Sequence, residues 1–188
     1  MGKITKISPL KDPKFIKPIE IQYTQSNQAK KWEAIISHNS VSILLWHKDE
    51  DAFVIVKQLR PPVLNVNEDG YMHELCAGIV DKNTSLVQIA KEEVLEECGY
   101  NIPTQNLQYI TSFFTSVGIS GAKQTLYYGE IDETMKEHDG GGIHDEEIEV
   151  IFLKISQAKE FMFNEKFQKT PGMMMAFYWF FENIKKNQ

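Results

Sequence analysis

The order of apolar segments along the chain constrains its fold more than any other feature of the sequence. Eight short segments have the alternating or continuous apolar pattern of β-strands: residues 19–25, 31–38, 41–47, 52–60, 71–77, 107–115, 124–131 and 148–154. Helical patterns occur at about residues 85–98, 156–164 and 171–186. The order is strands, helix, strands and helices, without the regular alternation of a doubly wound sheet. We therefore predict an α+β fold with a mostly antiparallel or mixed sheet.

Length and charge limit the class of protein. A chain of 188 residues with 42% hydrophobic residues is long enough for one sizeable core and too short for two large independent domains. The net charge of -6, without long runs of Lys or Arg, argues against a nucleic-acid-binding surface and a basic membrane-surface helix. No segment approaches the roughly 18 apolar residues of a membrane span, and the N-terminus lacks a signal-peptide core. We expect a soluble cytoplasmic protein, in which Cys76 and Cys98 are buried thiols.

The middle helical pattern has recognisable signals at both ends. Ser85 followed by Gln88 matches a capping box, in which the serine side chain accepts from the backbone and the glutamine side chain reaches back. Gly99 stands where a helix would end, because glycine readily adopts a left-handed backbone conformation. The sequence therefore predicts a helix from Leu86 to Cys98.

This predicted helix is unusually acidic. Four glutamates fall within six consecutive positions of "KEEVLEECGY", a pattern that is most often a solvated helix face. At about 100° per residue, Glu93, Glu96 and Glu97 lie within one arc, and Val87 and Val94 lie on a neighbouring arc that faces the core. Carboxylates that converge in this way repel one another unless a hard divalent cation such as Mg²⁺, which prefers oxygen ligands, neutralises them. The spacing therefore favours a metal site.

The segment that begins at Gly78 and ends at Tyr100 resembles the Nudix box, whose pattern is G, five residues, E, seven residues, R-E-U-x-E-E-x-G-U, with U aliphatic. Both glycines, Glu93, Glu96, Glu97 and the total spacing match. The flanking segments "VKQLRP", "ELCAG", "GISGAKQTLYYGEI" and "GGGIHDEEIEV" resemble the branch of the family that splits nucleoside diphosphate sugars. The resemblance implies a Nudix fold, in which a mixed β-sheet is sandwiched between helices.

Two positions depart from the pattern of the family. The first glutamate of the box is Thr84 here, and the arginine is Glu92, with Lys91 one position earlier. In the family this arginine pairs with a glutamate of the box, so an acid adds repulsion where an ion pair is expected. Lys82 and Lys91 are the candidate cations that would compensate.

The resemblance also implies which residues hold the metal. The implied ligands are Glu93, Glu97 and the backbone carbonyl of Ala77. They would bind Mg²⁺, with Mn²⁺ as an alternative, and the cation would offset the charge of the diphosphate. Glu96 would be a further ligand or a support for one, and so take part in catalysis.

The resemblance also implies a general base. It would lie in a loop after the sheet rather than in the box helix, the predicted helix of residues 86–98. The matching residue is Glu146, with Glu147 and Asp145 as neighbours. The three glycines of residues 140–142 would let this loop close over the substrate.

The substrate-binding candidates lie in the flanking segments. Arg60 is the single arginine among 20 Lys and Arg residues, and a planar guanidinium holds two phosphate oxygens at once. Glu74, Gly78 and Gln124 complete this set by resemblance.

The resemblance implies hydrolysis of a nucleoside diphosphate sugar, UDP-glucose in type, to a nucleoside monophosphate and a sugar 1-phosphate. An ADP-ribose diphosphatase that gives AMP and ribose 5-phosphate is the alternative within the family. Glu92 and Thr84 also leave open a protein of another class, a catalytically weak sensor with a Nudix fold that binds the nucleotide.

The resemblance further implies that residues 1–40 form a β-strand dimerisation region ahead of a Nudix hydrolase domain at residues 41–188. Segments 19–25 and 31–38 read as a hairpin, and an isolated two-stranded ribbon needs cover for its apolar face. We predict a homodimer in which Arg60 or its neighbours lie near the partner chain. The alternative is that the hairpin extends the sheet of its own chain.

Overall fold

A computed structural model describes residues 2–143 and 146–187 and places most strands in one mixed sheet. The path of the sheet is β5-β4-β3-β8-β7, with β6 paired to β3 and β9 paired to β4. These strands are β3 (Ser40–His47), β4 (Ala52–Leu59), β5 (Tyr71–Glu74), β6 (Cys76–Ile79), β7 (Leu107–Phe114), β8 (Lys123–Ile131) and β9 (Ile148–Lys154). The β3–β8 pair is parallel, whereas β3–β4 and β7–β8 are antiparallel. The predicted α+β class with a mixed sheet is confirmed.

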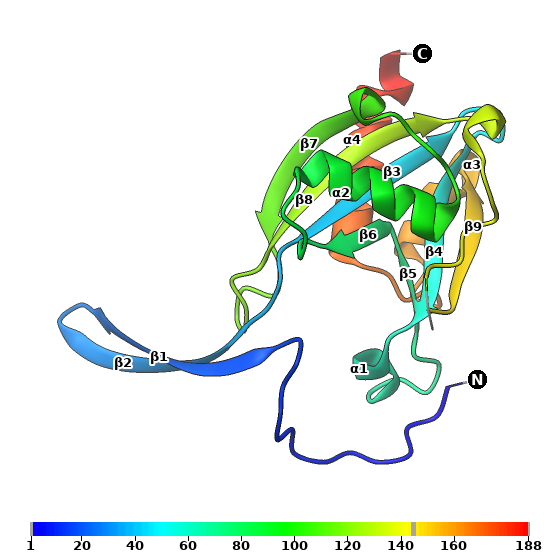
Figure 1. The fold of residues 1–188 in the computed structure, drawn as a ribbon. Helices are drawn as coiled ribbons and strands as arrows, with labels where there is room; N and C mark the ends of the chain where they lie inside the picture. Colours follow the sequence, from blue (N-terminus) through cyan, green and yellow to red (C-terminus); the bar gives the residue numbers. More distant parts are fainter. Residues whose placement is uncertain (1, 144–145, 188) are drawn as a thin grey trace.

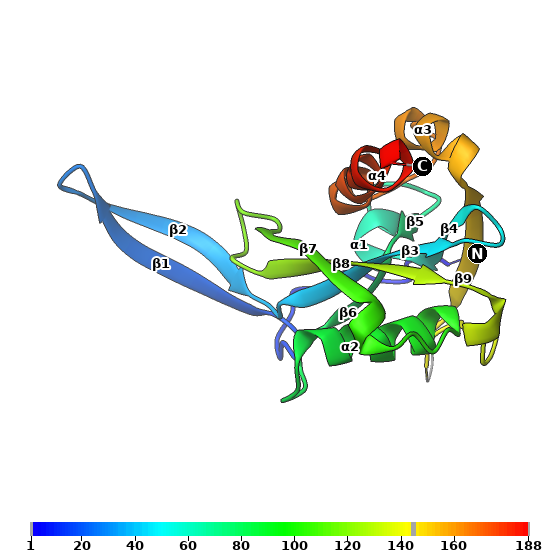
Figure 2. The ribbon, with the colours of Figure 1, turned by 90° about the horizontal axis from the view of Figure 1, so that it is seen from above.

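Helices cover both faces of this sheet. The helical segments of the described residues are α1 (Pro61–Leu64), α2 (Leu86–Glu93), α3 (Ile155–Phe163) and α4 (Pro171–Asn183), with a π-helix, η1 (Val94–Cys98), and the 3-10 turns η2 (Thr104–Asn106), η3 (Glu133–Met135) and η4 (Lys185–Asn187). Figure 2 shows α2 on one face of the sheet and α3 and α4 on the other. In the part of the chain that the structure describes, no helix has the length and apolar character needed to cross a membrane.

Strand β3 lies inside the sheet and is buried on both faces. Leu44 and Trp46 belong to the core cluster that includes α3 and α4. Ile43 and Leu45 belong to the core cluster that includes α2. Burial on both sides explains why this segment is a nearly continuous apolar run rather than an alternating one.

One predicted strand is two strands in the structure. The segment 71–77 divides at the buried residue Leu75 into β5, which pairs with β4, and β6, which pairs with β3. Apolar periodicity did not indicate the break, because residues on both sides of it contribute to the sheet. The division places Glu74 and Ala77 on different strands, and both residues line one pocket.

The N-terminal strands form a hairpin apart from the main sheet. Strands β1 (Lys17–Gln25) and β2 (Gln28–Ile36) make a separate two-stranded sheet, which projects from the rest of the chain (Figure 1). Ser26 and Asn27 form its turn with φ of 54° and 59°, the left-handed conformation that tight hairpin turns require. The hairpin was predicted, and the alternative that it extends the main sheet of its own chain is wrong.

The hairpin touches the main body at the loop between β7 and β8. The Trp32 indole Nε1 donates to the Gly118 carbonyl at 2.9 Å. The Ile35 backbone N–H donates to the Ile119 carbonyl at 2.8 Å. These contacts fix the base of the ribbon beside residues 116–122.

Candidate active site

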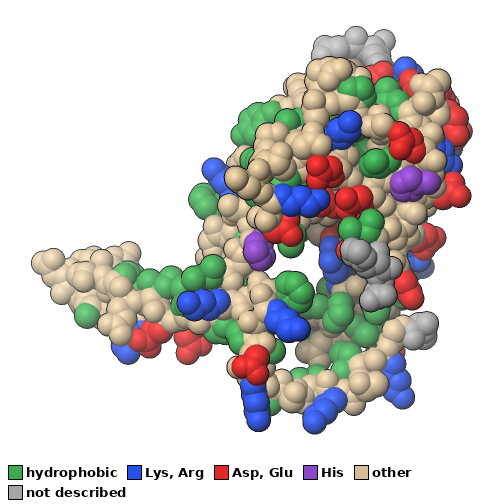
Figure 3. Space-filling model, viewed as in Figure 1, with side chains coloured by type: hydrophobic (Ala, Val, Ile, Leu, Met, Phe, Trp, Pro, Cys, Tyr) green, Lys and Arg blue, Asp and Glu red, His purple; other side chains and the backbone are tan. Residues whose placement is uncertain are grey.

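The box helix, strand β6 and the loop before β9 border one pocket of about 470 Å³. Figure 3 shows acidic side chains gathered over α2, next to a hollow in this face of the molecule. The pocket is lined by Ser40, Gln58, Arg60, Glu74, Ala77, Gly78, Ile79, Asp81, Lys82, Glu93, Glu96, Glu97, Gln124, Ile143 and Glu146.

Every site residue predicted from the sequence lines this pocket except Glu147. Glu147 is exposed and lies outside the lining. Asp145, its neighbour in the predicted loop, lies outside the described residues. Sequence analysis missed Ser40, Gln58 and Asp81, which carry no motif signal and reach the pocket only through the fold.

The N-terminal end of the box helix has half of the predicted capping box. The Ser85 side chain accepts from the Gln88 backbone N–H at 3.3 Å. The Gln88 side chain donates to Glu92 at 3.0 Å, instead of returning to the backbone of Ser85. The helix therefore starts where predicted, and the Gln88 side chain forms a hydrogen bond with a neighbouring acid.

The C-terminal end of the same helix differs from the prediction. The helical segment from Leu86 to Cys98 is confirmed, but its last five residues form the π-helix η1. Gly99 follows it with φ of 81°, and a side chain there would overlap the His138 carbonyl. π-Helical turns are rare and occur often at functional sites. This turn alters the α-helical spacing on which the predicted arc of glutamates rests.

The glycine-rich loop packs against this helix end. The Gly141 N–H donates to the Glu97 carbonyl at 2.9 Å, and the Gly142 N–H donates to the Glu96 carbonyl at 3.1 Å. Gly140 has φ of 74°, and a side chain there would overlap the Glu97 carbonyl. The glycine run, which was expected for loop closure, therefore also permits close contact with the box helix.

Glu146 reaches the pocket from this loop. Its Oε2 accepts from the Ile143 N–H at 3.0 Å. Its charge contributes to the raised pKa of both Glu93 and Glu97. The loop acid therefore faces the carboxylates of the box helix.

Glu97 is the most deeply buried of these carboxylates, with 6% of its surface exposed. Its Oε2 accepts from the Ala77 N–H at 3.0 Å. Burial raises the pKa of Glu97 to about 8, and repulsion from Glu93 and Glu146 adds to this effect. A charged Glu97 is thus unfavourable in this site without a cation.

Glu93 packs against the backbone of β6. A side chain on Gly78 would overlap the Glu93 carboxyl group, which explains a glycine at this position. Burial raises the pKa of Glu93 to about 7, with a further contribution from Glu96.

The donor set fits a hard divalent cation by its chemistry. The carboxylates of Glu93, Glu96 and Glu97 and the carbonyl of Ala77 supply oxygen, the ligand atom that Mg²⁺ prefers. The predicted convergence on a single point is not present: within residues 2–143 and 146–187, no group of three or more His, Cys, Asp and Glu side chains is placed to hold a metal ion. The carboxylates surround one pocket and would have to turn toward a cation.

Arg60 and Glu74, both predicted to bind substrate, bind each other. Arg60 Nε donates to Glu74 Oε1 and Nη2 donates to Oε2, each at 2.7 Å. This pair raises the pKa of Arg60, and the charges of Glu97 and Glu146 raise it further. The guanidinium fork is therefore held at the edge of the pocket by a carboxylate.

The acid that replaces the box arginine also has a partner. Lys82 Nζ lies 2.7 Å from Glu92 Oε2, and this contact lowers the pKa of Glu92. Sequence analysis left Lys82 and Lys91 open as compensating cations, and the structure identifies Lys82. Thr84, the other departure from the box, is exposed.

Known proteins are similar to this chain over most of its length. A uridine diphosphate glucose pyrophosphatase of Mus musculus is 33% identical, with 90% of each chain aligned, and that of Bos taurus is 31% identical over the same shares. A GDP-mannose pyrophosphatase of Cronobacter sakazakii is 33% identical, with 65% of this chain and 63% of the relative aligned. No protein-family model matches the chain.

The raised pKa values of Glu93 and Glu97 predict how stability depends on pH. Because both folded-state pKa values, about 7 and about 8, lie above the ordinary 4.5, the folded protein retains protons that the unfolded chain releases. Metal-free stability should be greatest below about pH 4.5 with respect to these groups, and should fall as pH rises through 7 and 8. Thermal unfolding across this range, with and without Mg²⁺, should show the largest rise in Tm from Mg²⁺ near pH 8.

The matched variant for this experiment is Glu97→Gln, whose side-chain oxygen still accepts from Ala77. It should flatten the metal-free pH profile and slightly raise Tm at about pH 8. Profiles of the same slope for the variant and the wild type would contradict the assignment.

Proposed function

The chain belongs to the Nudix hydrolase family, among its nucleoside diphosphate sugar pyrophosphatases, and from this premise we propose that it hydrolyses a UDP-glucose-like nucleotide sugar. The products would be a nucleoside monophosphate and a sugar 1-phosphate. The two relatives that align over 90% of this chain are uridine diphosphate glucose pyrophosphatases, which supports a UDP-sugar as the substrate.

The observation that carries the proposal is the shared pocket of the box helix and the glycine loop. It brings the carboxylates of Glu93, Glu96 and Glu97 to face Glu146, with Arg60 at the edge. Hydrolysis of a diphosphate needs oxygen ligands for a divalent cation, a base for water and a cation for phosphate oxygens, and these groups supply all three.

We propose that Glu93, Glu97 and the Ala77 carbonyl hold Mg²⁺ or Mn²⁺, with Glu96 as a further ligand or a support. The bound cation would supply positive charge against the diphosphate and make water more acidic. The burial of Glu97 favours cation binding, because a neutralised carboxylate cluster is more stable than a charged empty one.

Glu146 is the proposed general base. It would accept a proton from the attacking water as the bond from phosphorus to the bridging oxygen breaks. Arg60 would bind a phosphate oxygen while Glu74 orients its guanidinium through the bidentate pair. Glu74, Gly78 and Gln124 complete the proposed substrate contacts.

The deciding experiment is release of UMP from UDP-glucose in the presence of Mg²⁺. The wild type should turn over, and Glu97→Gln should lose most activity at low Mg²⁺ because one charged ligand is removed. Retention of the fold by circular dichroism is the control. Binding of UDP-glucose without release of UMP would instead support the nucleotide sensor, and turnover independent of Mg²⁺ would contradict the metal site.

The assignment of the base predicts different effects for two neighbouring acids. Glu146→Gln should lower kcat by about two or more orders of magnitude with little change in KM, because a general base acts in the transition state. Glu147→Gln, on an exposed side chain outside the pocket, is the matched control and should retain activity. A larger effect of Glu147→Gln would assign the base to Glu147 instead. Small and equal effects of the two variants would exclude a base in this loop.

We further propose that the N-terminal hairpin, in residues 1–40, is a dimerisation region of the hydrolase domain at 41–188. Ile21 pairs across the hairpin with Trp32, and residues directly opposite each other in a ribbon share one face. Trp32 is 52% exposed and Ile21 is 43% exposed. A ribbon with such a face is barely stable unless another surface covers it.

A homodimer should result, with Arg60 or its neighbours near the partner and an interface above about 2,000 Å² in total. Light scattering coupled to size exclusion should report twice the chain mass. Trp32→Glu should yield monomers with reduced activity, because a charge on the face that the partner would cover opposes association. Lys31→Glu, on the opposite face of the ribbon, is the control and should remain dimeric. A fully active wild-type monomer at micromolar concentration would contradict this arrangement.

A further inference from the structure

Lys82 lies at the candidate active site, in the short loop between strand β6 and the box helix. At the start of this loop the Val80 N–H donates to the Asn39 carbonyl at 2.8 Å, and at its end Ser85 caps the helix. Lys82 lines the same pocket as Glu93. The fold therefore holds at the pocket a lysine for which the proposed reaction has no role.

The ammonium of Lys82 is held by an exposed ion pair. Its Nζ donates to Glu92 Oε2 at 2.7 Å, and the two side chains are 48% and 32% exposed. The Gln88 side chain donates to the other carboxylate oxygen of Glu92 at 3.0 Å. An ion pair with this exposure contributes little to stability, and an ammonium has three N–H donors. Lys82 can therefore keep its contact with Glu92 and still donate to a ligand in the pocket.

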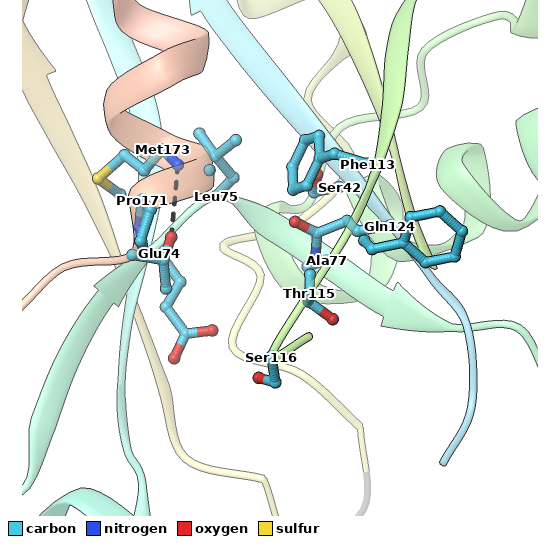
Figure 4. Close-up of a pocket in the computed structure, with 13 residues that line it drawn as sticks. Ser42, Glu74, Leu75, Ala77, Phe113, Thr115, Ser116, Gln124, Pro171 and Met173 are labelled. Atoms are coloured by element: carbon cyan, nitrogen blue, oxygen red, sulfur yellow. Dashed lines mark hydrogen bonds between the residues drawn. The ribbon is translucent and has the colours of Figure 1, made fainter. Parts of the chain in front are cut away.

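An anionic ligand needs positive charge in this pocket. Acids outnumber the bases Arg60 and Lys82 among the described residues that line it. Arg60 forms a bidentate pair with Glu74, which offsets its charge. A neighbouring cavity of about 380 Å³, which shares Glu74 with the pocket, has no Lys or Arg among the described residues of its lining (Figure 4). Because its own ion pair is exposed and uses one N–H, Lys82 is the basic group of the pocket that is freer to bind a diphosphate.

Lys82 and Arg60 act on different carboxylates. The bond to Glu92 raises the pKa of Lys82, and the charges of Glu96 and Glu93 raise it further. The ammonium of Lys82 therefore lies close enough to these two proposed metal ligands to respond to their charge. The charges that act on Arg60 are those of other acids of the pocket. The two cations thus serve different parts of the carboxylate cluster, which suits a ligand with two phosphoryl groups.

We propose that Lys82 is a substrate-binding residue, whose ammonium donates to an oxygen of one phosphoryl group of the diphosphate. Arg60 would bind the other phosphoryl group. Hydrogen bonds from an ammonium to a phosphate oxygen are charge-assisted and stronger than those between neutral groups. This role rests on the proposed function and extends it, because it adds a second cation to the binding of the diphosphate.

Substitution of Lys82 tests this role at saturating Mg²⁺. Lys82→Ala should raise KM for UDP-glucose about tenfold with little change in kcat, because it removes a charge-assisted hydrogen bond made both in the bound substrate and in the transition state. Lys82→Arg keeps the charge and should recover most of the affinity. Lys91→Ala, which removes the same charge outside the pocket lining, is the matched control and should leave KM unchanged. An unchanged KM in Lys82→Ala would overturn the proposal.

Glu92→Gln separates substrate binding by Lys82 from a structural role of the ion pair. Both Glu92→Gln and Lys82→Ala remove the ion pair, but only Lys82→Ala removes a cation from the pocket. Glu92→Gln should therefore leave KM unchanged or lower it. A rise in KM as large as that of Lys82→Ala would show that Lys82 acts through Glu92, and would overturn the proposal.

The dependence on Mg²⁺ separates a direct effect on the substrate from an indirect effect through the metal. A positive charge near the carboxylates opposes the binding of a divalent cation. Lys82→Ala should therefore need no more Mg²⁺ than the wild type for half-maximal activity. Recovery of the wild-type KM at higher Mg²⁺ would assign Lys82 to the metal site and overturn the proposal.

Calorimetric titration with the two products makes the test independent of turnover. With Mg²⁺ present, Lys82→Ala should weaken binding of UMP or of glucose 1-phosphate about tenfold, and Glu92→Gln should weaken neither. Release of UMP by the wild type, with normal binding of both products by Lys82→Ala, would overturn the role of Lys82 and leave the hydrolase standing. Weaker binding of a product by Lys82→Ala, without hydrolysis of UDP-glucose by the wild type, would overturn the hydrolase and support the role of Lys82.

Discussion

The close packing of the box-helix end between strand β6 and the glycine loop is the constraint on which the candidate site depends. On one side, the Ala77 N–H donates to the Glu97 carboxylate. On the other, the Gly141 and Gly142 N–H groups donate to carbonyls of the helix. Close approach on both sides leaves no room for a side chain at Gly78 or Gly140. The same contacts that satisfy the helix end also bury its acids.

Burial of the acids destabilises their charged forms in the metal-free protein and favours the binding of a cation. The chain has cations near the site, but Arg60 pairs with Glu74 and Lys82 pairs with Glu92. Neither ion pair involves Glu97, whose pKa is raised to about 8 by burial. Carboxyl groups that would repel one another when ionised are therefore gathered where a divalent cation would add most to stability, an arrangement typical of sites that give up folding energy for function.

Sequence reasoning was most successful where the signal is local. Most strands, the helix that starts at Leu86 and the left-handed Gly99 follow from periodicity and end signals, and the predicted Glu93 and Glu97 line one pocket. It was weakest where partners are distant. The π-helical turn packs against the distant glycine loop, and the pairing of Arg60 with Glu74 depends on the register of β4 and β5. Neither of these features produces a pattern among residues that are adjacent in the sequence.

One loop connects the N-terminal hairpin to a cavity beside the candidate active site. Thr115 and Ser116 line a cavity of about 380 Å³ that shares Glu74, Ala77 and Gln124 with the pocket beside the box helix. Two residues further on, the Gly118 carbonyl accepts from Trp32 on the apolar face of the hairpin. Because interfaces and packed loops transmit displacement over such short distances, a partner chain seated on the hairpin would act directly on the wall of the cavity. Assembly and the shape of this cavity would then be coupled through residues 115–118.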